Sequence, residues 1–186
     1  MKAFDVIIVG GAVVGSAAAY FLASQPDFKG SVLVLEKDFS YEKCATTLSA
    51  ASIRHQYSTV GNIQMSQFGT QFIKQIGDHL SVAGESPDIG FHEKGYLFLA
   101  TQAGKDILES NHRVQRSSNA DVVLLTPAQL QERYPWMNTD DLYAGSFGQT
   151  GEGWLDAYSL MQAFRRKAIS LGVQYRQAEV ASLVRV

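Results

Sequence analysis

The stretch Phe4-Asp-Val-Ile-Ile-Val-Gly-Gly-Ala-Val-Val-Gly15 decides the fold of this chain. Its first half, Phe4 to Val9, is an apolar run rich in β-branched residues, which is typical of a strand buried on both faces of a parallel sheet. Its second half is a glycine-containing turn that leads into an alanine-rich helix over Val14 to Ser24, ended by Pro26. Ser31 to Glu36 is a second apolar run. Strand, helix and strand in this order predict a β–α–β unit.

The turn carries glycines at the first and last positions of the pattern Gly-x-Gly-x-x-Gly, which binds a dinucleotide pyrophosphate where it follows a strand and opens a helix. Gly10 permits the tight turn, and Gly15 permits close packing of helix on strand. The helix N-terminus presents N–H groups and a positive dipole end to the phosphates. Ala12 departs from the pattern by one methyl group. We therefore predict cofactor contacts along the whole turn, at Gly10, Gly11, Ala12, Val13, Val14 and Gly15.

Glu36 lies about 20 residues beyond the turn, at the end of the second predicted strand, and Lys37 follows it. A carboxylate at this place accepts hydrogen bonds from ribose hydroxyls and repels a 2′-phosphate, which argues against NADP. A glycine turn with a surface glutamate is the alternative. The agreement of strand, helix, strand and acid favours a binding site.

Composition limits the partners of the chain. Its 186 residues are 46% hydrophobic and 18% charged, with a net charge of −2, so it has the composition of a globular protein without a general attraction to nucleic acid or anionic lipid. The single cysteine, Cys44, excludes an internal disulfide and is expected to be a free, buried thiol in a reducing cytoplasm. No run approaches the ~20 apolar residues of a membrane span.

His79, His92 and His112 have no metal-ligand spacing, so we expect no metal site. Because of its single cysteine and its small net charge, we expect a cytoplasmic protein with a small-molecule partner. The sequence leaves its oligomeric state open.

Further segments follow the β–α–β unit. We expect a long Ser/Thr/Ala-rich loop and a helix start over Asp38 to Ser52, and then an amphipathic helix over Val60 to Leu80. A hairpin is expected over Phe91 to Ala100, with its turn near Lys94 and Gly95. The capping box Thr126-Pro-Ala-Gln129 predicts the start of one helix, Asp156 and Gly172 predict the start and end of another, and Val173 to Val186 is expected to be strand material.

A plain NAD-binding Rossmann domain continues after its acidic residue with another helix and strand, whereas here a loop leads into a long amphipathic helix. At this point the chain resembles the FAD-dependent amino-acid and amine oxidase family, which includes D-amino acid oxidase, glycine oxidase, sarcosine oxidase and proline dehydrogenase types. The resemblance rests on Asp5-Val-Ile-Ile-Val-Gly-Gly, Val34-Leu-Glu36-Lys37, Thr46-Thr-Leu-Ser-Ala-Ala-Ser-Ile-Arg54-His-Gln-Tyr, Gly95-Tyr-Leu-Phe-Leu and Gly153-Trp-Leu-Asp-Ala-Tyr-Ser-Leu, which together span nearly all of the chain.

The resemblance implies an α/β fold, in which a Rossmann-like FAD-binding domain with a glutathione-reductase-type β–α–β unit carries part of an inserted α+β substrate domain. The FAD-binding domain is expected at residues 1–83 and 150–186, and the portion of the substrate domain at residues 84–149. The family continues for a comparable length beyond this point. We therefore expect a fragment that is inactive by itself.

The resemblance also implies further cofactor contacts. It places Thr47, Ser49, Ala50 and Ala51 against the pyrophosphate and the flavin, where small side chains let backbone N–H groups reach the cofactor. The alternative is that Ser49 to Ser52 only cap a helix. Val180 is placed near the adenine.

Arg54, His55 and Gln56 are placed by the resemblance where the flavin ring faces the substrate. A guanidinium at Arg54 can hold a substrate carboxylate in a bidentate fork. His55 can take a proton from the substrate, because the unperturbed pKa of histidine is about 6.5. A structural ion pair at Arg54 and a structural hydrogen bond at His55 are the alternatives.

The function implied is that of an FAD-dependent oxidoreductase that oxidises the CH–NH bond of an amino acid or secondary amine by hydride transfer to the flavin. The substrate is expected to be an amino acid, an N-methyl amine or a hydroxy acid. An FAD-dependent 2-hydroxy-acid oxidoreductase is an alternative, and so is a non-catalytic flavoprotein that acts in the assembly of a partner. An NAD-dependent dehydrogenase is disfavoured by the sequence after Glu36.

Overall fold

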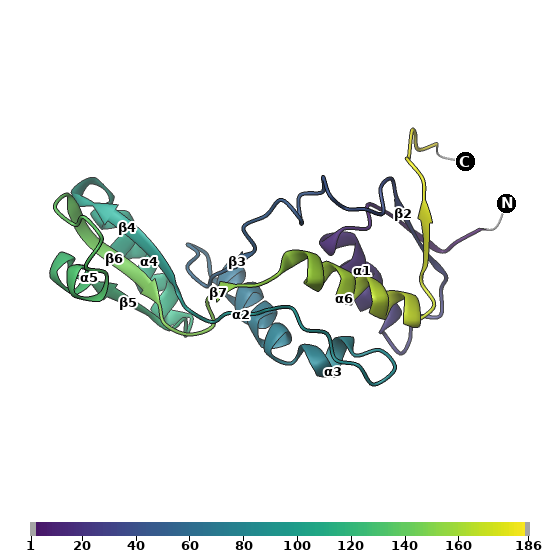
Figure 1. Cartoon of the computed structure of the whole chain (residues 1–186), viewed down its shortest axis with the longest axis horizontal. Coiled ribbons are helices and arrows are strands. Elements are labelled where there is room, and N and C mark those ends of the chain that lie inside the picture. Colours follow the sequence, from purple (N-terminus) through teal and green to yellow (C-terminus); the bar gives the residue numbers. More distant parts are fainter. Residues whose placement is uncertain (1–2, 185–186) are drawn as a thin grey trace. The chain divides into compact units, whose positions relative to one another are not determined.

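The computed structural model describes residues 3–184, which form two compact units (Figure 1). Unit 1 comprises residues 3–51, 76–90 and 156–184, and unit 2 comprises residues 52–75 and 91–155. The expected domain bounds differ from these units mainly in residues 52–75, which belong to unit 2. The assignment of an FAD-binding domain to residues 1–83 and 150–186 stays a prediction.

Unit 1 contains a parallel sheet of three strands in the order β1–β2–β8. They are β1 (Val6–Val9), β2 (Val32–Glu36) and β8 (Gln174–Gln177). The run Val32–Leu33–Val34 is buried, as the apolar sequence pattern predicts for a central strand. The β–α–β unit predicted from the first residues is therefore confirmed, and the C-terminal strand pairs with β2 from more than 130 residues away in register Leu33 to Gln174.

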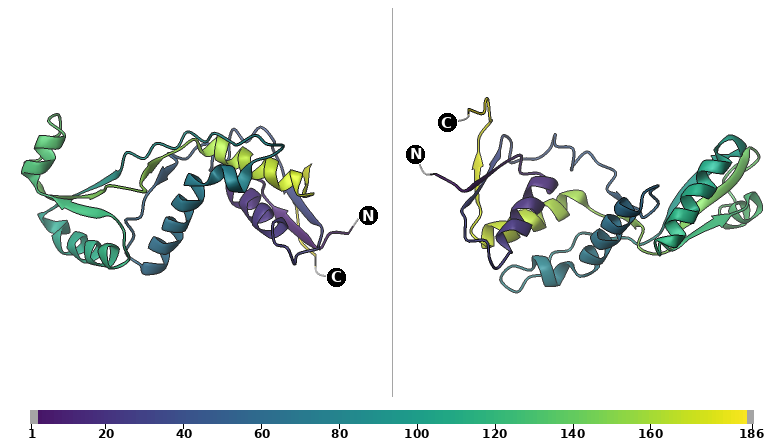
Figure 2. Two further views of the ribbon diagram at one scale, coloured as in Figure 1. Left: turned by 90° about the horizontal axis from the view of Figure 1, so that it is seen from below. Right: turned by 180° about the vertical axis from the view of Figure 1, so that it is seen from behind.

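Two helices pack on each other in unit 1, namely α1 (Val13–Ala23) and α6 (Ala157–Ser170), and both views in Figure 2 place them side by side. The rings of Tyr20 and Phe164 meet at 5.6 Å between centroids. As predicted, the side chain of Asp156 caps α6 by accepting a hydrogen bond from Ser159 N–H (3.0 Å), and Gly172 follows the helix with a φ of +95°. The short helix α3 (Ile76–Leu80) also belongs to unit 1.

Unit 2 is built on an antiparallel sheet in the order β4–β6–β5. Its elements are β4 (Tyr96–Thr101), the 3₁₀ turn η1 (Gln102–Gly104), α4 (Lys105–Ser117), β5 (Val122–Leu125), α5 (Pro127–Arg133), β6 (Leu142–Gly148), the short pair β3 (Ser52–Ile53) and β7 (Gly153–Trp154), and α2 (Val60–Lys74). Helix α4 lies along one face of the sheet (Figure 2). The capping box at Thr126 is confirmed, with both of its reciprocal hydrogen bonds present.

The predicted helix over Val60 to Leu80 is wrong in its length, because it is two helices. Gln75 has a φ of −107° and a ψ of 24°, and it closes α2 by donating its N–H to the carbonyls of Gln71 and Phe72. Ile63 and Phe72 are buried in unit 2, whereas Ile76 and Leu80 are buried in unit 1. The apolar residues keep a nearly helical spacing across Gln75 because those before it pack in the core of unit 2 and those after it pack in the core of unit 1.

The predicted hairpin over Phe91 to Ala100 is also wrong. Strand β4 begins at Tyr96 and pairs with β6, a strand more than 40 residues further along the chain. The backbone before it turns at Gly95, whose φ is +85° and whose N–H donates to the carbonyl of Glu152 (2.9 Å). His92 pairs instead with Trp154 in an isolated bridge.

Two further expectations need correction, and three elements were not expected. No helix starts within Asp38 to Ser52, which forms turns and ends in β3. Strand β8 covers only Gln174–Gln177 of the expected strand material, while Arg185 and Val186 lie outside the described residues. Helix α4 and strands β5 and β6 were not predicted from the sequence. Among the described helices, none is long and apolar enough to cross a membrane.

The packing of α1 on its turn generates a stability prediction. A Cβ atom on Gly15 would overlap the carbonyl oxygen of Gly10, so Gly15→Ala forces the turn to shift and should lower the free energy of unfolding by about 1–3 kcal/mol. Gly69 is the matched control, because a Cβ there meets no atom within 4 Å and alanine favours the helix, so Gly69→Ala should raise stability by up to about 1 kcal/mol. Urea unfolding of both variants is the measurement. Equal effects would contradict the close contact.

Candidate functional site

The glycine turn in unit 1 is held by hydrogen bonds of the backbone N–H and the carbonyl of Gly11. Its N–H donates to Glu36 Oε2 (2.8 Å), and its carbonyl accepts a hydrogen bond from Ser16 Oγ (2.6 Å). The other carboxylate oxygen of Glu36 accepts from Asp38 N–H (3.0 Å). Tyr175 on β8 donates its hydroxyl to Ser16 Oγ (3.0 Å). The acid predicted to bind ribose is thus locked at the end of β2, with both oxygens oriented by backbone donors.

The N-terminus of α1 is suited to an anion. The first turn holds no acidic side chain, and Ala12 at the N-cap offers no side-chain acceptor. The N–H of Val13 donates to Thr46 Oγ1 at 3.3 Å. The helix dipole therefore keeps its positive end toward whatever occupies the turn. Gly10 adopts a φ of +96°, which a residue with a side chain rarely does.

A cavity of about 340 Å³ adjoins the turn and brings together residues from distant parts of the sequence. It is lined by Val9, Gly10, Leu35, Glu36, Lys37, Cys44, Ala178, Glu179 and Val180. Four predicted cofactor residues, Gly10, Glu36, Lys37 and Val180, therefore share one cavity. The cavity is in the size range of small-molecule sites.

Cys44 in this cavity was not among the predicted site residues. Its thiol is free, as expected, but it is half-buried, so the expectation of a buried thiol is wrong. Burial raises the pKa of this thiol, and hydrogen bonds with the side chain and backbone of Thr47 outweigh the burial, so the pKa lies below its usual value.

The loop at residues 46–51 caps no helix, which removes the alternative role for Ser49 to Ser52. Thr47, Ser49 and Ala50 are exposed, and Ala51 has a φ of +50°. Ser49 Oγ accepts a hydrogen bond from Ala51 N–H (2.9 Å) and so stabilises this unusual backbone. The contact of this loop with a cofactor stays a prediction.

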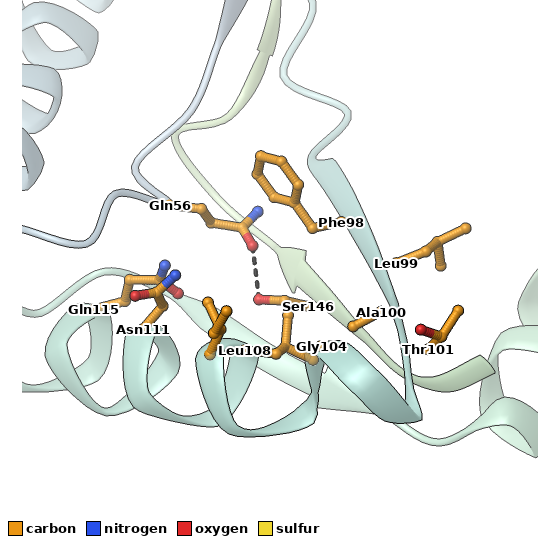
Figure 3. A pocket seen from close by; sticks show the side chains of 11 residues that line it. Gln56, Phe98, Leu99, Ala100, Thr101, Gly104, Leu108, Asn111, Gln115 and Ser146 are labelled. Carbon is orange, nitrogen blue, oxygen red and sulfur yellow. Dashed lines mark hydrogen bonds between the residues drawn. The ribbon is translucent and has the colours of Figure 1, made fainter.

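A fully buried carboxylate, Glu152, organises unit 2. Its Oε1 accepts a hydrogen bond from His55 N–H (2.7 Å), and its Oε2 accepts one from Gln56 Nε2 (2.8 Å). Gln56 Nε2 also donates to the carbonyl of Tyr96 (2.8 Å), and Gln56 Oε1 accepts from Ser146 Oγ (2.7 Å), the bond drawn in Figure 3. Burial raises the pKa of Glu152, and these hydrogen bonds and the charge of Arg54 oppose the rise.

Sequence reasoning missed Glu152. A signal was present, since a glutamate between Gly151 and Gly153 follows strand β6, but nothing local says that it is buried. Gly148 makes the burial possible, because a Cβ atom there would overlap the Glu152 carboxylate.

His55 is buried, and its imidazole is engaged. Its Nε2 lies 2.9 Å from Thr70 Oγ1, and Thr70 Oγ1 donates to the carbonyl of Gly151 (3.0 Å). Because the hydroxyl has one hydrogen, Thr70 must accept from His55, which assigns a proton to the Nε2 atom of the imidazole. Burial and the charge of Lys74 lower the pKa of His55, although Glu93 opposes them.

Arg54 has no carboxylate partner within ion-pair distance among residues 3–184. Its guanidinium carbon lies 4.9 Å from the ring centroid of Tyr57, 5.7 Å from that of Tyr96 and 5.4 Å from that of Phe98. Its Nε is buried with no hydrogen-bond partner in the described part of the chain. The carbonyl of Arg54 accepts from Ser66 Oγ on α2, which fixes its backbone. Among the described residues, the half-buried guanidinium thus lies in an aromatic cage without an ion-pair partner, although its charge acts on the Glu152 carboxylate.

These features define the chain as a dinucleotide-binding protein of the Rossmann type. The turn without a side chain at Gly10, the α1 N-terminus without an acid, and the oriented Glu36 carboxylate fit a pyrophosphate and a ribose. The family model for FAD dependent oxidoreductases matches residues 5–186, and the chain belongs to this family. FAD is accordingly the cofactor whose pyrophosphate and ribose these groups fit.

Two curated relatives illustrate the family. FAD-dependent oxidoreductase domain-containing protein 1 of Xenopus laevis is 46% identical over 179 residues, covering 95% of this chain and 36% of the relative. Sarcosine oxidase subunit beta of an Arthrobacter species is 31% identical over 182 residues, covering 95% of this chain and 43% of the relative.

Solved structures share the fold. L-proline dehydrogenase of P. horikoshii superimposes with a TM-score of 0.80 at 24% identity, over 96% of this chain and 45% of that one. Glycine oxidase of Geobacillus kaustophilus gives a TM-score of 0.76 at 25% identity, over 94% of this chain and 46% of that one. The chain spans less than half the length of each of these four relatives.

The Glu36 geometry predicts FAD affinity. Glu36→Gln replaces a charged acceptor of the Gly11 N–H by a neutral amide, so the Kd for FAD, measured by quenching of flavin fluorescence, should rise about tenfold or more. Glu179→Gln is the matched control, because Glu179 lines the same cavity, and it should leave the Kd within about twofold. An equal rise in both variants would mean that only the charge of the cavity matters.

The burial of His55 predicts a pH dependence of stability. Because its folded pKa is lowered, the unfolded chain binds the proton more readily, and stability is lost as the pH falls from about 6.5 through the folded pKa. His55→Gln should remove this loss, so that urea unfolding of the variant changes less than wild type between about pH 7.5 and about pH 5.5. Thr70→Ser keeps the hydroxyl and should retain the wild-type dependence.

Proposed function

We propose that the chain is part of an FAD-dependent enzyme that oxidises the CH–NH bond of an amino acid or secondary amine. The observation that carries the proposal is the unpaired Arg54 guanidinium in its aromatic cage. No carboxylate of the described residues forms an ion pair with this guanidinium, although its charge acts on Glu152, so a carboxylate that enters from solvent could add two parallel hydrogen bonds. Two of the proteins named above, sarcosine oxidase subunit beta and glycine oxidase, are named for sarcosine and glycine, each of which carries a carboxylate.

Arg54 would hold the substrate carboxylate and thereby orient its α carbon. The guanidinium is planar and always charged, so it limits the rotation of a bound carboxylate as a lysine would not. FAD, when bound, supplies the hydride acceptor for this α carbon. In this proposal the turn, the 47–51 loop and Val180 contact the cofactor, and Arg54 contacts the substrate carboxylate.

His55 and Gln56 would act as positioning residues. Both side chains are buried, and both are engaged, His55 with Thr70 and Gln56 with Glu152, Tyr96 and Ser146. Their bonds fix the backbone that directly follows the Arg54 carbonyl, and Ser66 on α2 holds that carbonyl itself. Preorganisation of the guanidinium is the contribution that we assign to them, and not proton transfer.

The test is the affinity of the FAD-loaded, full-length protein for amino acids. Arg54→Met should raise the Kd for a carboxylate substrate or inhibitor by about tenfold to a hundredfold, because a charge-assisted bidentate pair is lost. Flavin content and thermal stability should stay unchanged. Arg113→Met is the matched control, since Arg113 is exposed on α4. If Arg54→Met lowered the thermal stability but left the affinity for carboxylates unchanged, the proposal that Arg54 holds the substrate carboxylate would be wrong.

Anaerobic bleaching of the flavin separates the reactions. Amino acids, N-methyl amines and 2-hydroxy acids are added in turn, and bleaching by an amine or amino acid supports the proposal. Bleaching by hydroxy acids alone would favour the 2-hydroxy-acid oxidoreductase, whose substrate the same clamp would hold. No bleaching by any of them would favour a non-catalytic flavoprotein.

A further inference from the structure

A second cavity, of about 460 Å³, lies in unit 2 between α4 and the sheet (Figure 3). Its lining from α4 recurs at helical spacing, so that one side of this helix forms one wall. Strand β4 contributes its residues 98–101, and Gln56 and Ser146 also line the cavity. The lining residues are Gln56, Phe98, Leu99, Ala100, Thr101, Gly104, Ile107, Leu108, Asn111, Gln115 and Ser146.

Gln115 is the unusual residue of this cavity. It is only 4% exposed, and its Nε2 donates to the carbonyl of Tyr57 (3.2 Å). Its Oε1 is buried and has no hydrogen-bond partner among the residues that the structure describes. Buried polar atoms are nearly always paired, so an unpaired acceptor beside a cavity points to a donor that comes from outside the chain.

The remaining lining defines the chemistry of that donor. The polar side chains are amides and hydroxyls, and no ionisable residue belongs to the lining. Phe98, Ile107 and Leu108 supply apolar walls. The lining offers a charged group no partner of opposite charge, whereas an apolar group that carries one neutral donor can contact these side chains and pair with Gln115 Oε1.

The cavity begins beside Arg54. Phe98, whose ring is 5.4 Å from the Arg54 guanidinium carbon, lines it, and so does Gln56, two residues along the chain. A molecule whose carboxylate rests on Arg54 can therefore extend its other end past Phe98 toward α4.

We propose that this cavity takes the uncharged, largely apolar side chain or N-substituent of the substrate, and that a hydroxyl or amide N–H on it donates to Gln115 Oε1. The inference rests on the proposed carboxylate clamp at Arg54. It narrows the substrate from amino acids in general to those with a neutral, donor-bearing apolar group.

The probes are straight-chain carboxylic acids from butanoate to octanoate and their ω-hydroxy analogues, titrated into the FAD-loaded, full-length protein by calorimetry. At the length that reaches Gln115, the hydroxy acid should bind about fivefold tighter than the alkyl acid of equal size, as one net hydrogen bond provides. Gln115→Met should abolish this preference while it retains binding of the alkyl acid. Ser110→Ala, at an exposed position of α4, should keep it.

A second variant guards against misfolding of Gln115→Met. Ala100→Leu fills the cavity without touching its polar groups, so it should weaken the long acids at least about fivefold and leave acetate unchanged. The proposal is overturned if the hydroxy acids bind no more tightly than the alkyl acids at any length. It is also overturned if they still bind more tightly in Gln115→Met.

Neutral probes separate this inference from the clamp. Primary alcohols from butanol to octanol should bind more tightly than their methyl ethers, which lack the donor, and the difference should disappear in Gln115→Met. If Arg54→Met leaves the affinity for the acids unchanged while the alcohols still bind more tightly than their ethers, the carboxylate role of Arg54 is wrong and the role of the cavity is supported. If Arg54→Met weakens the acids but neither series distinguishes a hydroxyl, the cavity fails and the clamp stands.

Discussion

A buried carboxylate that accepts hydrogen bonds from backbone and amide donors is the interaction on which the candidate site depends. Glu152 joins segments that are almost a hundred residues apart in the sequence, because its oxygens accept from His55 N–H and Gln56 Nε2 while its own carbonyl accepts from Gly95 N–H. An acid without these donors would not be stable inside a protein. The positions of Arg54, of the start of β4 and of the end of β6 follow from this single group.

Unit 1 uses the same device at its own binding element. The carboxylate of Glu36 accepts from Gly11 N–H and Asp38 N–H, as Glu152 accepts from the 55–56 segment. In both places an acid orients a backbone segment that lies next to residues proposed to bind a ligand. The cost of holding a carboxylate in place is offset by N–H groups that would otherwise lack partners. Ser16 and Tyr175 extend this network from the turn to β8.

Against these satisfied networks, the unsatisfied groups stand out. Arg54 Nε lacks a hydrogen-bond acceptor and Gln115 Oε1 lacks a donor in the described residues, and both belong to unit 2. The proposed substrate, with a carboxylate at one end and a neutral donor at the other, would supply both of these missing partners. His55 and Gln56, which the family resemblance placed beside the substrate, have their hydrogen bonds directed into the protein.

The β–α–β unit, the glycine turn, the acid at Glu36 and the caps at Thr126 and Asp156 were determined by the sequence itself, because each is a local pattern read within a few turns of chain. Family resemblance added FAD and drew attention to Arg54. Only the tertiary structure decided that Gln75 splits one apolar periodicity between two cores, that β4 pairs with β6, and that Glu152 and Gln115 are buried. The reason is physical: these outcomes depend on contacts between residues tens to a hundred positions apart, and the burial of a side chain is a property of its neighbours in space.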